Sequence, residues 1–289
     1  MLHDAFEIAL PEARTTSVVF ASPHSGRLYP AAFLERASLD ECEIRSSEDA
    51  FVDELYASAP RAGAPLIAAR YPRAYIDLNR SADELDPALI EGIGRRGHNP
   101  RIASGLGVVP RVVAGGRMIY RGKITRAEAR DRIDTIWRPY HERLRQLLDE
   151  SHAAFGEAIL VDCHSMPHEA LEALGGAATG PGRPEVVLGD RYGAAAHPDL
   201  VDRIEQIFTA AGLKVARNMP FAGAYVVQTY GRPARGRHAV QIELDRALYM
   251  DETRIAPNAN YPAMQALMDR VVAEIAAIGR RTDLSVAAE

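Results

Sequence analysis

The chain has 289 residues, of which 47% are hydrophobic and 25% are charged, as is ordinary for a soluble globular protein. This length is sufficient for a large core, in one α/β domain or in two small domains. The formal net charge of -5 argues against a dedicated nucleic-acid binder.

The start of the chain lacks the features of a targeting segment. Residues 1–16 carry acids at Asp4 and Glu7 and no long apolar stretch, so we expect neither a signal peptide nor a membrane anchor. No run along the chain reaches the roughly 20 apolar residues that a spanning helix needs. The two cysteines, Cys42 and Cys163, do not suggest a disulfide framework. We therefore expect a cytoplasmic protein without a membrane partner.

Apolar runs of strand length recur along the chain. Continuous apolar runs are typical of strands that are buried on both faces, as in a sheet covered by helices. The expected strands are 17–24, 64–71, 74–79, 158–165, 185–191, 225–231 and 238–245.

Amphipathic segments separate these runs. Thr125 and Glu128 form a candidate capping box at the start of the longest segment, and Pro139 should kink or divide that helix. The alternation of strands and helices predicts an α/β fold with a mixed, mostly parallel sheet flanked by helices. The expected helices are 42–60, 125–155, 198–212 and 260–280.

Two segments are rich in glycine and proline and lack clear periodicity. Segment 81–124 is interpreted as a long excursion near the functional site, with a short hairpin around 115–122. Segment 171–184 is interpreted as a surface loop, with a lid as the alternative.

Two histidines lie at the ends of predicted buried strands. His24 follows the first strand in the sequence SPHSG, and His164 ends the strand AILVDCHS. A single histidine at a turn is ordinarily a capping or surface residue. Two at separate strand ends can converge in an α/β sheet, and imidazole is a common zinc ligand. Asp162 is a candidate for fixing a histidine tautomer, whereas Cys163 points to the opposite side and is interpreted as a core residue.

A catalytic zinc site with two histidines needs a carboxylate as third ligand and an open position for water. Glu48 and Asp49 are the nearest candidates, at the start of a predicted helix. The alternative is that they only stabilise the start of the helix, where the helix dipole favours acidic side chains.

Further polar residues follow two other predicted strands. Asn79 and Arg80 form a compact donor pair for a carboxylate, with Arg73 nearby. Glu243, near the end of a buried strand, has the chemistry of a general base beside an activated water. Structural ion pairs are the alternative in both cases.

Five motifs in this order resemble the N-formylglutamate amidohydrolase family: SPHSG, ED-x-x-VDELY, YIDLNR, VDCHSMP and QIELDR-x-LYMDE. The match runs from about residue 17 to about residue 252. The resemblance implies a zinc-exopeptidase-like (phosphorylase/hydrolase-like) fold, with residues 1–289 forming a single hydrolase domain. It also implies hydrolysis of the small molecule N-formyl-L-glutamate to formate and L-glutamate, in histidine degradation.

The resemblance also implies roles for residues of this chain. His24 and His164 would bind Zn²⁺, with Asp49 preferred to Glu48 as third ligand. The His-x-x-Glu pattern of the zinc carboxypeptidases is absent, because Arg27 stands where the glutamate would be. Glu243 would be the catalytic base.

The carboxypeptidase-like pair Asn79-Arg80 would bind a substrate carboxylate. A substrate with two carboxylates would need a second cation, and the sequence does not choose among Arg73, Arg232, Arg235 and Arg237.

Two other functions remain open at this level. One is a related deacylase or carboxypeptidase-like amidase with a different acyl group or amino acid. The other is a non-catalytic protein that binds an acidic ligand. The sequence does not determine the identity of the metal, because two histidines and a carboxylate also bind divalent ions other than Zn²⁺. It does not determine the oligomeric state either.

Overall fold

The computed structural model describes residues 4–94, 99–174 and 183–280. Its main strands are β1 (Phe6–Ala9), β2 (Val18–Ser22), β3 (Leu66–Ala69), β4 (Ala158–Met166), β5 (Val186–Gly189), β6 (Val215–Arg217) and β7 (Arg237–Asp245), and a separate pair comprises β8 (Met250–Asp251) and β9 (Ala256–Pro257).

Within the described ranges, the seven main strands form one mixed sheet in the order β1-β3-β2-β4-β7-β5-β6. The central strands β3, β2, β4 and β7 are parallel, whereas β1 is antiparallel to β3 and β5 is antiparallel to β7. This sheet confirms the predicted α/β fold with a mostly parallel sheet. Because parallel strands share an edge at their carboxyl ends, β2, β4 and β7 deliver their last residues to one place.

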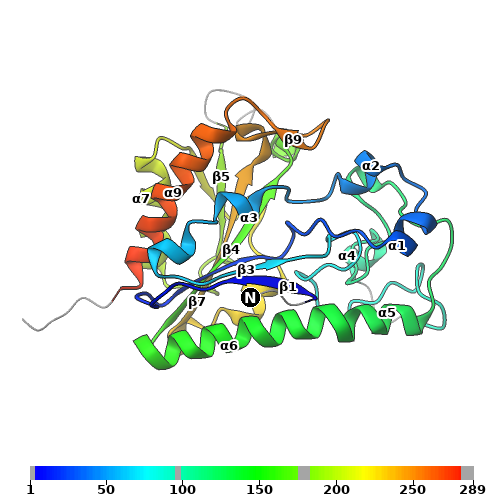
Figure 1. Cartoon of the computed structure of the whole chain (residues 1–289), viewed down its shortest axis with the longest axis horizontal. Coiled ribbons are helices and arrows are strands. Elements are labelled where there is room, and N and C mark those ends of the chain that lie inside the picture. Colours follow the sequence, from blue (N-terminus) through cyan, green and yellow to red (C-terminus); the bar gives the residue numbers. More distant parts are fainter. Residues whose placement is uncertain (1–3, 95–98, 175–182, 281–289) are drawn as a thin grey trace, which may run out of the picture.

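Helices cover both faces of the sheet (Figure 1). The face toward α5, α6 and α8 takes every second residue of β2 and β4, and the face toward α3, α7 and α9 takes the others. This alternation explains why these strands are apolar throughout. The helices are α1 (Ala31–Arg36), α2 (Glu41–Arg45), α3 (Val52–Leu55), α4 (Pro100–Ala103), α5 (Arg126–Arg132), α6 (Arg138–Phe155), α7 (Pro198–Ala210), α8 (Tyr225–Tyr230) and α9 (Tyr261–Ile278).

Two predicted strands are wrong. Segment 74–79 forms turns, because the amides of Tyr75 and Ile76 donate to the Pro72 carbonyl instead of to a neighbouring strand. Segment 225–231 forms helix α8, which packs its buried Val226 and Val227 against the sheet. Both runs are short and apolar, and at that length the pattern does not distinguish a buried strand from a buried helical turn.

The predicted helix 42–60 is broken into α2, α3 and a 3₁₀ turn at Ala59–Ala62. Phe51 has a φ of 65°, a left-handed conformation that no helix interior accepts. The break lets Glu48 and Asp49 leave the helical path and approach the end of β2, where the Asp49 amide donates to the His24 carbonyl.

Pro139 divides the long helix as predicted. A π-helical turn at Ile133–Trp137 separates α5 from α6, since Pro139 has no N–H to donate to the preceding turn. Only half of the predicted capping box forms: the Thr125 hydroxyl accepts from the Glu128 amide, but the Glu128 carboxylate pairs with Arg36 and Arg132.

The predicted hairpin lies slightly earlier than 115–122, with Val112 bridged to Met118 around a turn at Ala114–Gly116. Of the predicted loop 171–184, residues 175–182 lie outside the described residues.

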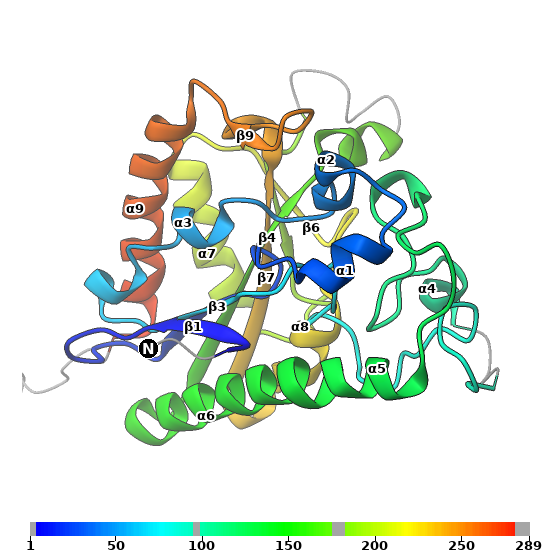
Figure 2. The ribbon, with the colours of Figure 1, turned by 45° about the vertical axis from the view of Figure 1, so that its right-hand side comes forward.

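No helix in the described ranges combines the length and apolar character that crossing a bilayer requires. In Figure 2, α4, which belongs to segment 81–124, lies at the right of the molecule and α9 at the left.

Candidate metal centre

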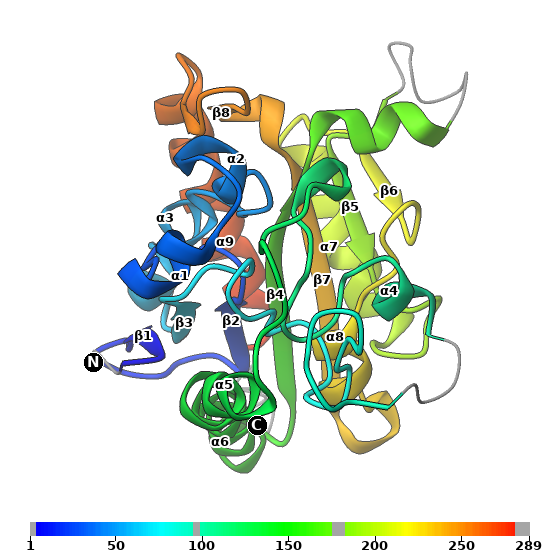
Figure 3. The ribbon, with the colours of Figure 1, turned by 90° about the vertical axis from the view of Figure 1, so that its right-hand side faces the viewer.

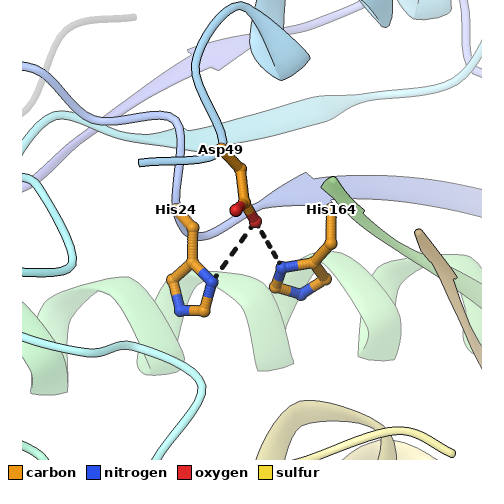
Figure 4. A group of neighbouring side chains, drawn as sticks. All are labelled: His24, Asp49 and His164. Atoms are coloured by element: carbon orange, nitrogen blue, oxygen red, sulfur yellow. Dashed lines mark hydrogen bonds and ion pairs between the residues drawn. The ribbon is translucent and has the colours of Figure 1, made fainter. Parts of the chain in front are cut away.

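Three buried side chains converge where β2 and β4 end. His24 lies two residues beyond β2, His164 lies near the end of β4, and Asp49 lies in the break between α2 and α3. One donor atom from each lies within 4.8 Å of the others. Figure 4 shows both imidazole rings turned toward one oxygen of Asp49. Its Oδ2 lies 2.8 Å from Nδ1 of His164 and 3.4 Å from Nδ1 of His24.

Each histidine is held through its other nitrogen by a second carboxylate. Nε2 of His24 lies 2.7 Å from Oδ1 of Asp77, and Nε2 of His164 lies 3.1 Å from Oδ2 of Asp162. A carboxylate that accepts the Nε2 proton fixes the tautomer and leaves Nδ1 with a free lone pair. Metal-binding histidines have this arrangement in proteins.

Asp49 is oriented by a buried arginine. Nη2 of Arg246 donates to Oδ1 of Asp49 at 3.0 Å, which leaves Oδ2 for the histidines. Glu48 is turned elsewhere: its carboxylate accepts from the Tyr29 hydroxyl and from Arg45. The structure therefore places Asp49, and not Glu48, beside the two histidines.

The charge balance of the site fits a cation. Burial by itself would raise the pKa of Asp49, but His164 and His24 outweigh it and hold this pKa well below its usual range. Burial also opposes the charge on His164, yet Asp162 and Asp49 raise its pKa well above the usual value. Carboxylates thus surround the rings and favour positive charge between them.

The residues present fit a metal ion by two independent observations. Nδ1 of His24 is buried and makes no hydrogen bond, although buried polar atoms are nearly always satisfied. The donor set of two imidazoles and one carboxylate is that of known catalytic zinc sites, which leave a fourth position open. The group of His24, Asp49 and His164 could therefore hold a metal ion.

Glu243 lies on the strand next to His164. In the parallel pairing of β4 with β7, His164 lies opposite Glu243 and Asp162 opposite Gln241. Paired residues point to the same face, so these four side chains share one face while Cys163 packs into the core behind it. Nε2 of Gln241 donates to one carboxylate oxygen of Glu243 at 2.7 Å. Burial raises the pKa of Glu243 to about 7.

The predicted carboxylate-binding residues lie beside this group. Arg80 is only 8% exposed, and its Nε and Nη1 donate to the carbonyls of Leu106 and Asn79. Arg73 donates to Oδ2 of Asp77 at 2.9 Å. Both arginines line the cavity.

Asn79 lies between two elements of the site. Its Oδ1 accepts from the Val226 amide at the start of α8, and its Nδ2 lies 3.1 Å from Nε2 of His164. The side chain thus already has partners at both ends of its amide group, and its role in substrate binding stays a prediction.

The three candidate ligands share one cavity of about 590 Å³ with the polar residues around them, which are Arg73, Asp77, Asn79, Arg80, Gln241, Glu243 and Arg246. Its wall includes Pro220–Ala224, the hairpin turn at Ala114–Gly116, and Arg101 on α4. In Figure 3, α4 and α8 are drawn in the lower right of the view, and β4 and β7 run through its centre. A larger cavity, of about 940 Å³, lies between residues 82–94 and α5 and contains none of the metal-site residues.

The structure does not bring Arg232, Arg235 or Arg237 to this cavity. Arg237 pairs with Asp149, and Arg232 donates to carbonyls of its own turn. The sequence reasoning instead missed Arg101 and the orienting role of Arg246. Arg101 follows no predicted strand, and the Arg246–Asp49 contact joins residues 197 positions apart.

Comparison with known proteins gives a consistent result. The family model described as N-formylglutamate amidohydrolase matches residues 16–250. The N-formylglutamate deformylase of Pseudomonas aeruginosa is 32% identical over 240 residues, covering 81% of this chain and 82% of the relative. That of Pseudomonas putida is also 32% identical over 240 residues, covering 82% of each chain.

Two solved structures have the same fold. The crystal structure of N-formylglutamate amidohydrolase from Ralstonia eutropha JMP134 is 37% identical, with a TM-score of 0.88, and covers 95% of this chain and 98% of its own. A gene product of Agrobacterium tumefaciens is 17% identical, with a TM-score of 0.62 and coverage of 94% of each chain, which supports the fold alone.

Proposed function

This chain belongs to the N-formylglutamate amidohydrolase family, and on that premise we propose that it hydrolyses N-formyl-L-glutamate to formate and L-glutamate with the help of a bound divalent metal, most simply Zn²⁺. One observation carries the proposal: His24, Asp49 and His164 form a buried metal-binding set whose neighbour on the next strand is Glu243.

The metal ligands in this proposal are His24, Asp49 and His164. When bound there, Zn²⁺ would lower the pKa of a water molecule and polarise the scissile carbonyl. The chain prepares the site for it, because Asp77, Asp162 and Arg246 fix the orientations of the three ligands. Each ligand is therefore pre-positioned by a partner from another part of the chain.

Glu243 acts as the general base. Gln241 occupies one of its carboxylate oxygens, so the other is available for a proton. Glu243 accepts a proton from the attacking water as the new C–O bond forms, and it delivers a proton to the amide nitrogen as the C–N bond breaks. The products are formate and the free amino group of glutamate. A carboxyl with a pKa near 7 is matched to both transfers.

Arg80 binds a carboxylate of the substrate and so places the scissile bond beside Glu243. Its two hydrogen bonds to main-chain carbonyls use Nε and Nη1 and leave Nη2 for the ligand. Arg73 and Asn79 assist at the same wall of the cavity. A guanidinium held by fixed bonds loses less entropy when it binds a carboxylate.

The decisive experiment couples metal analysis to formate release. We expect purified protein to contain about one zinc per chain, to release formate from N-formyl-L-glutamate, and to lose this activity on chelation. The variant His164→Ala should lose both zinc and activity. Protein without stoichiometric metal, whose activity a chelator leaves unchanged, would contradict the metal-dependent mechanism.

A substrate panel tests the named substrate. N-acetyl- and N-succinyl-glutamate carry larger acyl groups, and N-formylmethionine carries an apolar side chain. We expect the highest kcat/KM on N-formyl-L-glutamate, and a higher value on any of the others would assign the site to a related deacylase.

The proposal extends to the setting of the reaction. The family resemblance supports a role in histidine degradation, and two free cysteines support a reducing, cytoplasmic location. The two main hydrophobic clusters lie on the two faces of the same sheet, which supports residues 1–289 acting as one hydrolase domain.

A further inference from the structure

The cavity wall contains more arginine charge than its own acids neutralise. Its charged residues, apart from the histidines, are three acids and four arginines. Two of the arginines are paired: Arg73 with Asp77 at 2.9 Å, and Arg246 with Asp49 at 3.0 Å. Arg80 and Arg101 have no acidic partner among the lining residues, although Oε2 of Glu84, just outside the lining, lies 4.0 Å from Nε of Arg80. The third acid of the wall is the base Glu243.

Arg101 differs from the other three arginines because it is exposed. Within the ranges that the structure describes, its side chain makes no hydrogen bond or ion pair. Its backbone, in contrast, is fixed: the Arg101 amide donates to Oδ1 of Asn99, and the Arg101 carbonyl accepts from the Leu106 amide. Burial raises the pKa of Glu84 and the charge of Arg101 acts to lower it, but no hydrogen bond from the described residues holds the guanidinium. Such a group on a fixed backbone is suited to binding an anion from solution.

The loop around Leu106 joins Arg101 to Arg80. Nε of Arg80 donates to the Leu106 carbonyl at 3.1 Å, and the Leu106 amide donates to the Arg101 carbonyl at 2.8 Å. The two guanidinium groups repel each other: burial lowers the pKa of Arg80 most, and the charges of Arg73 and Arg101 lower it further, whereas Asp77 and Glu84 raise it. An anion between them would relieve this repulsion.

We propose that Arg101 binds the side-chain carboxylate of the substrate, while Arg80 binds its α-carboxylate. This assignment rests on the proposed function, because it assumes an N-acyl amino acid with two carboxylates. The α-carboxylate is one carbon from the scissile nitrogen, so it needs the buried arginine next to Asn79, whose amide contacts His164. The side-chain carboxylate lies further out and meets the exposed arginine at the cavity wall.

Arg101 therefore determines specificity for an acidic side chain. A neutral amide in place of the side-chain carboxylate cannot form the charge-assisted pair that a guanidinium forms with a carboxylate. The cavity thus distinguishes glutamate from glutamine without direct help from the metal-binding group.

The test compares N-formyl-L-glutamate with N-formyl-L-glutamine for the wild type and Arg101→Gln. We expect kcat/KM of the variant to fall roughly 10- to 100-fold on the glutamate substrate, mainly through KM, which is the usual contribution of a hydrogen-bonded charged pair. On the glutamine substrate the variant should match the wild type. Arg101→Lys should recover part of the loss, since it restores the charge without the planar fork.

The matched control is Arg203→Gln, which removes an exposed arginine of α7 that lies outside the cavity. It should leave both substrates unaffected. Calorimetric binding of the product L-glutamate gives a readout without turnover, and Arg101→Gln should weaken it while L-glutamine binding stays the same.

Equal losses on both substrates, or no loss on either, would overturn the role of Arg101 while leaving the proposed hydrolysis intact. No formate release by the zinc-loaded wild type from N-formyl-L-glutamate would overturn the proposed function, and the assignment of Arg101 to its substrate with it.

Discussion

At the scale of single residues, each member of the proposed metal-binding group is held by one partner. Asp77 holds His24, Asp162 holds His164, and Arg246 holds Asp49. The sequence predicted such a role for Asp162 but not for Asp77. In the structure all three partners turn one donor atom of His24, Asp49 and His164 toward the same point, as the proposed metal site requires.

Asp77→Asn should weaken zinc binding about 10- to 100-fold, because an amide no longer fixes the His24 tautomer as a carboxylate does. Competition with a zinc chelator measures this affinity directly. Asp86→Asn is the matched control: Asp86 is also a buried aspartate paired with an arginine, Arg111, but it lies outside the metal site. If both variants bind zinc as tightly as the wild type, Asp77 does not orient His24.

At the scale of elements, the strands that carry the site were predictable and the connections were not. The buried strands β2, β4 and β7 are apolar runs in the sequence. The polar residues at their ends suggested His24, His164 and Glu243 as functional residues. The break that frees Asp49 and the helix α8 that contacts Asn79 depend on packing between distant segments. No local pattern encodes such contacts, since tertiary packing overrides intrinsic propensity.

The turn after β2 also depends on a contact between distant segments, because it packs closely against the main chain near Tyr71. A side chain at Gly26 would collide with the main-chain carbonyl of Tyr71, in the segment that follows β3. Gly26→Ala must therefore push the two segments apart beside His24. We expect a loss of about 1–3 kcal/mol in the free energy of unfolding, as for other overpacked sites, measured by urea denaturation.

Gly122→Ala is the control for this substitution, because Gly122 has open space around it. It should change stability by less than about 0.5 kcal/mol, as surface substitutions usually do. Equal effects of the two variants would show that the contact between Gly26 and Tyr71 is not a constraint.

At the scale of the whole molecule, the order of strands in the sheet differs from their order in the chain. β7 lies next to β4, although β5 and β6 come between them in the sequence. The sequence predicted a mostly parallel sheet, but hydrophobic periodicity contains no information on which strands are neighbours. The residue pattern suggested Glu243 and left Glu48 and Asp49 open as the third ligand, and the family resemblance then favoured Asp49.

Stability in acid should depend on His141, which lies on α6 and reaches toward the site segment. Its ring nitrogens lie 2.9 Å from the Leu78 carbonyl and from the Tyr230 hydroxyl, and burial lowers its pKa from 6.5 to about 3. The unfolded chain therefore takes up a proton first, and stability falls as the pH drops below about 6.5 toward about 3.

His141→Gln should reduce this acid sensitivity. Between pH 7 and pH 5 the wild type should lose about 2 kcal/mol more than the variant in the free energy of unfolding, measured by denaturant titration at each pH. The variant itself will be less stable at pH 7, so the slope with pH is the decisive quantity. Parallel slopes would show that His141 is not a buried neutral histidine.

The pairing of Arg246 with Asp49 has a consequence for biosynthesis. The two residues are 197 positions apart, and ribosomes add roughly 5–20 residues per second. About 10 to 40 seconds therefore pass between the synthesis of Asp49 and that of the arginine that orients it. During this interval the nascent chain lacks the arginine that orients Asp49. A metal ion bound as proposed would therefore meet the fully oriented site only after β7 and Arg246 have left the ribosome.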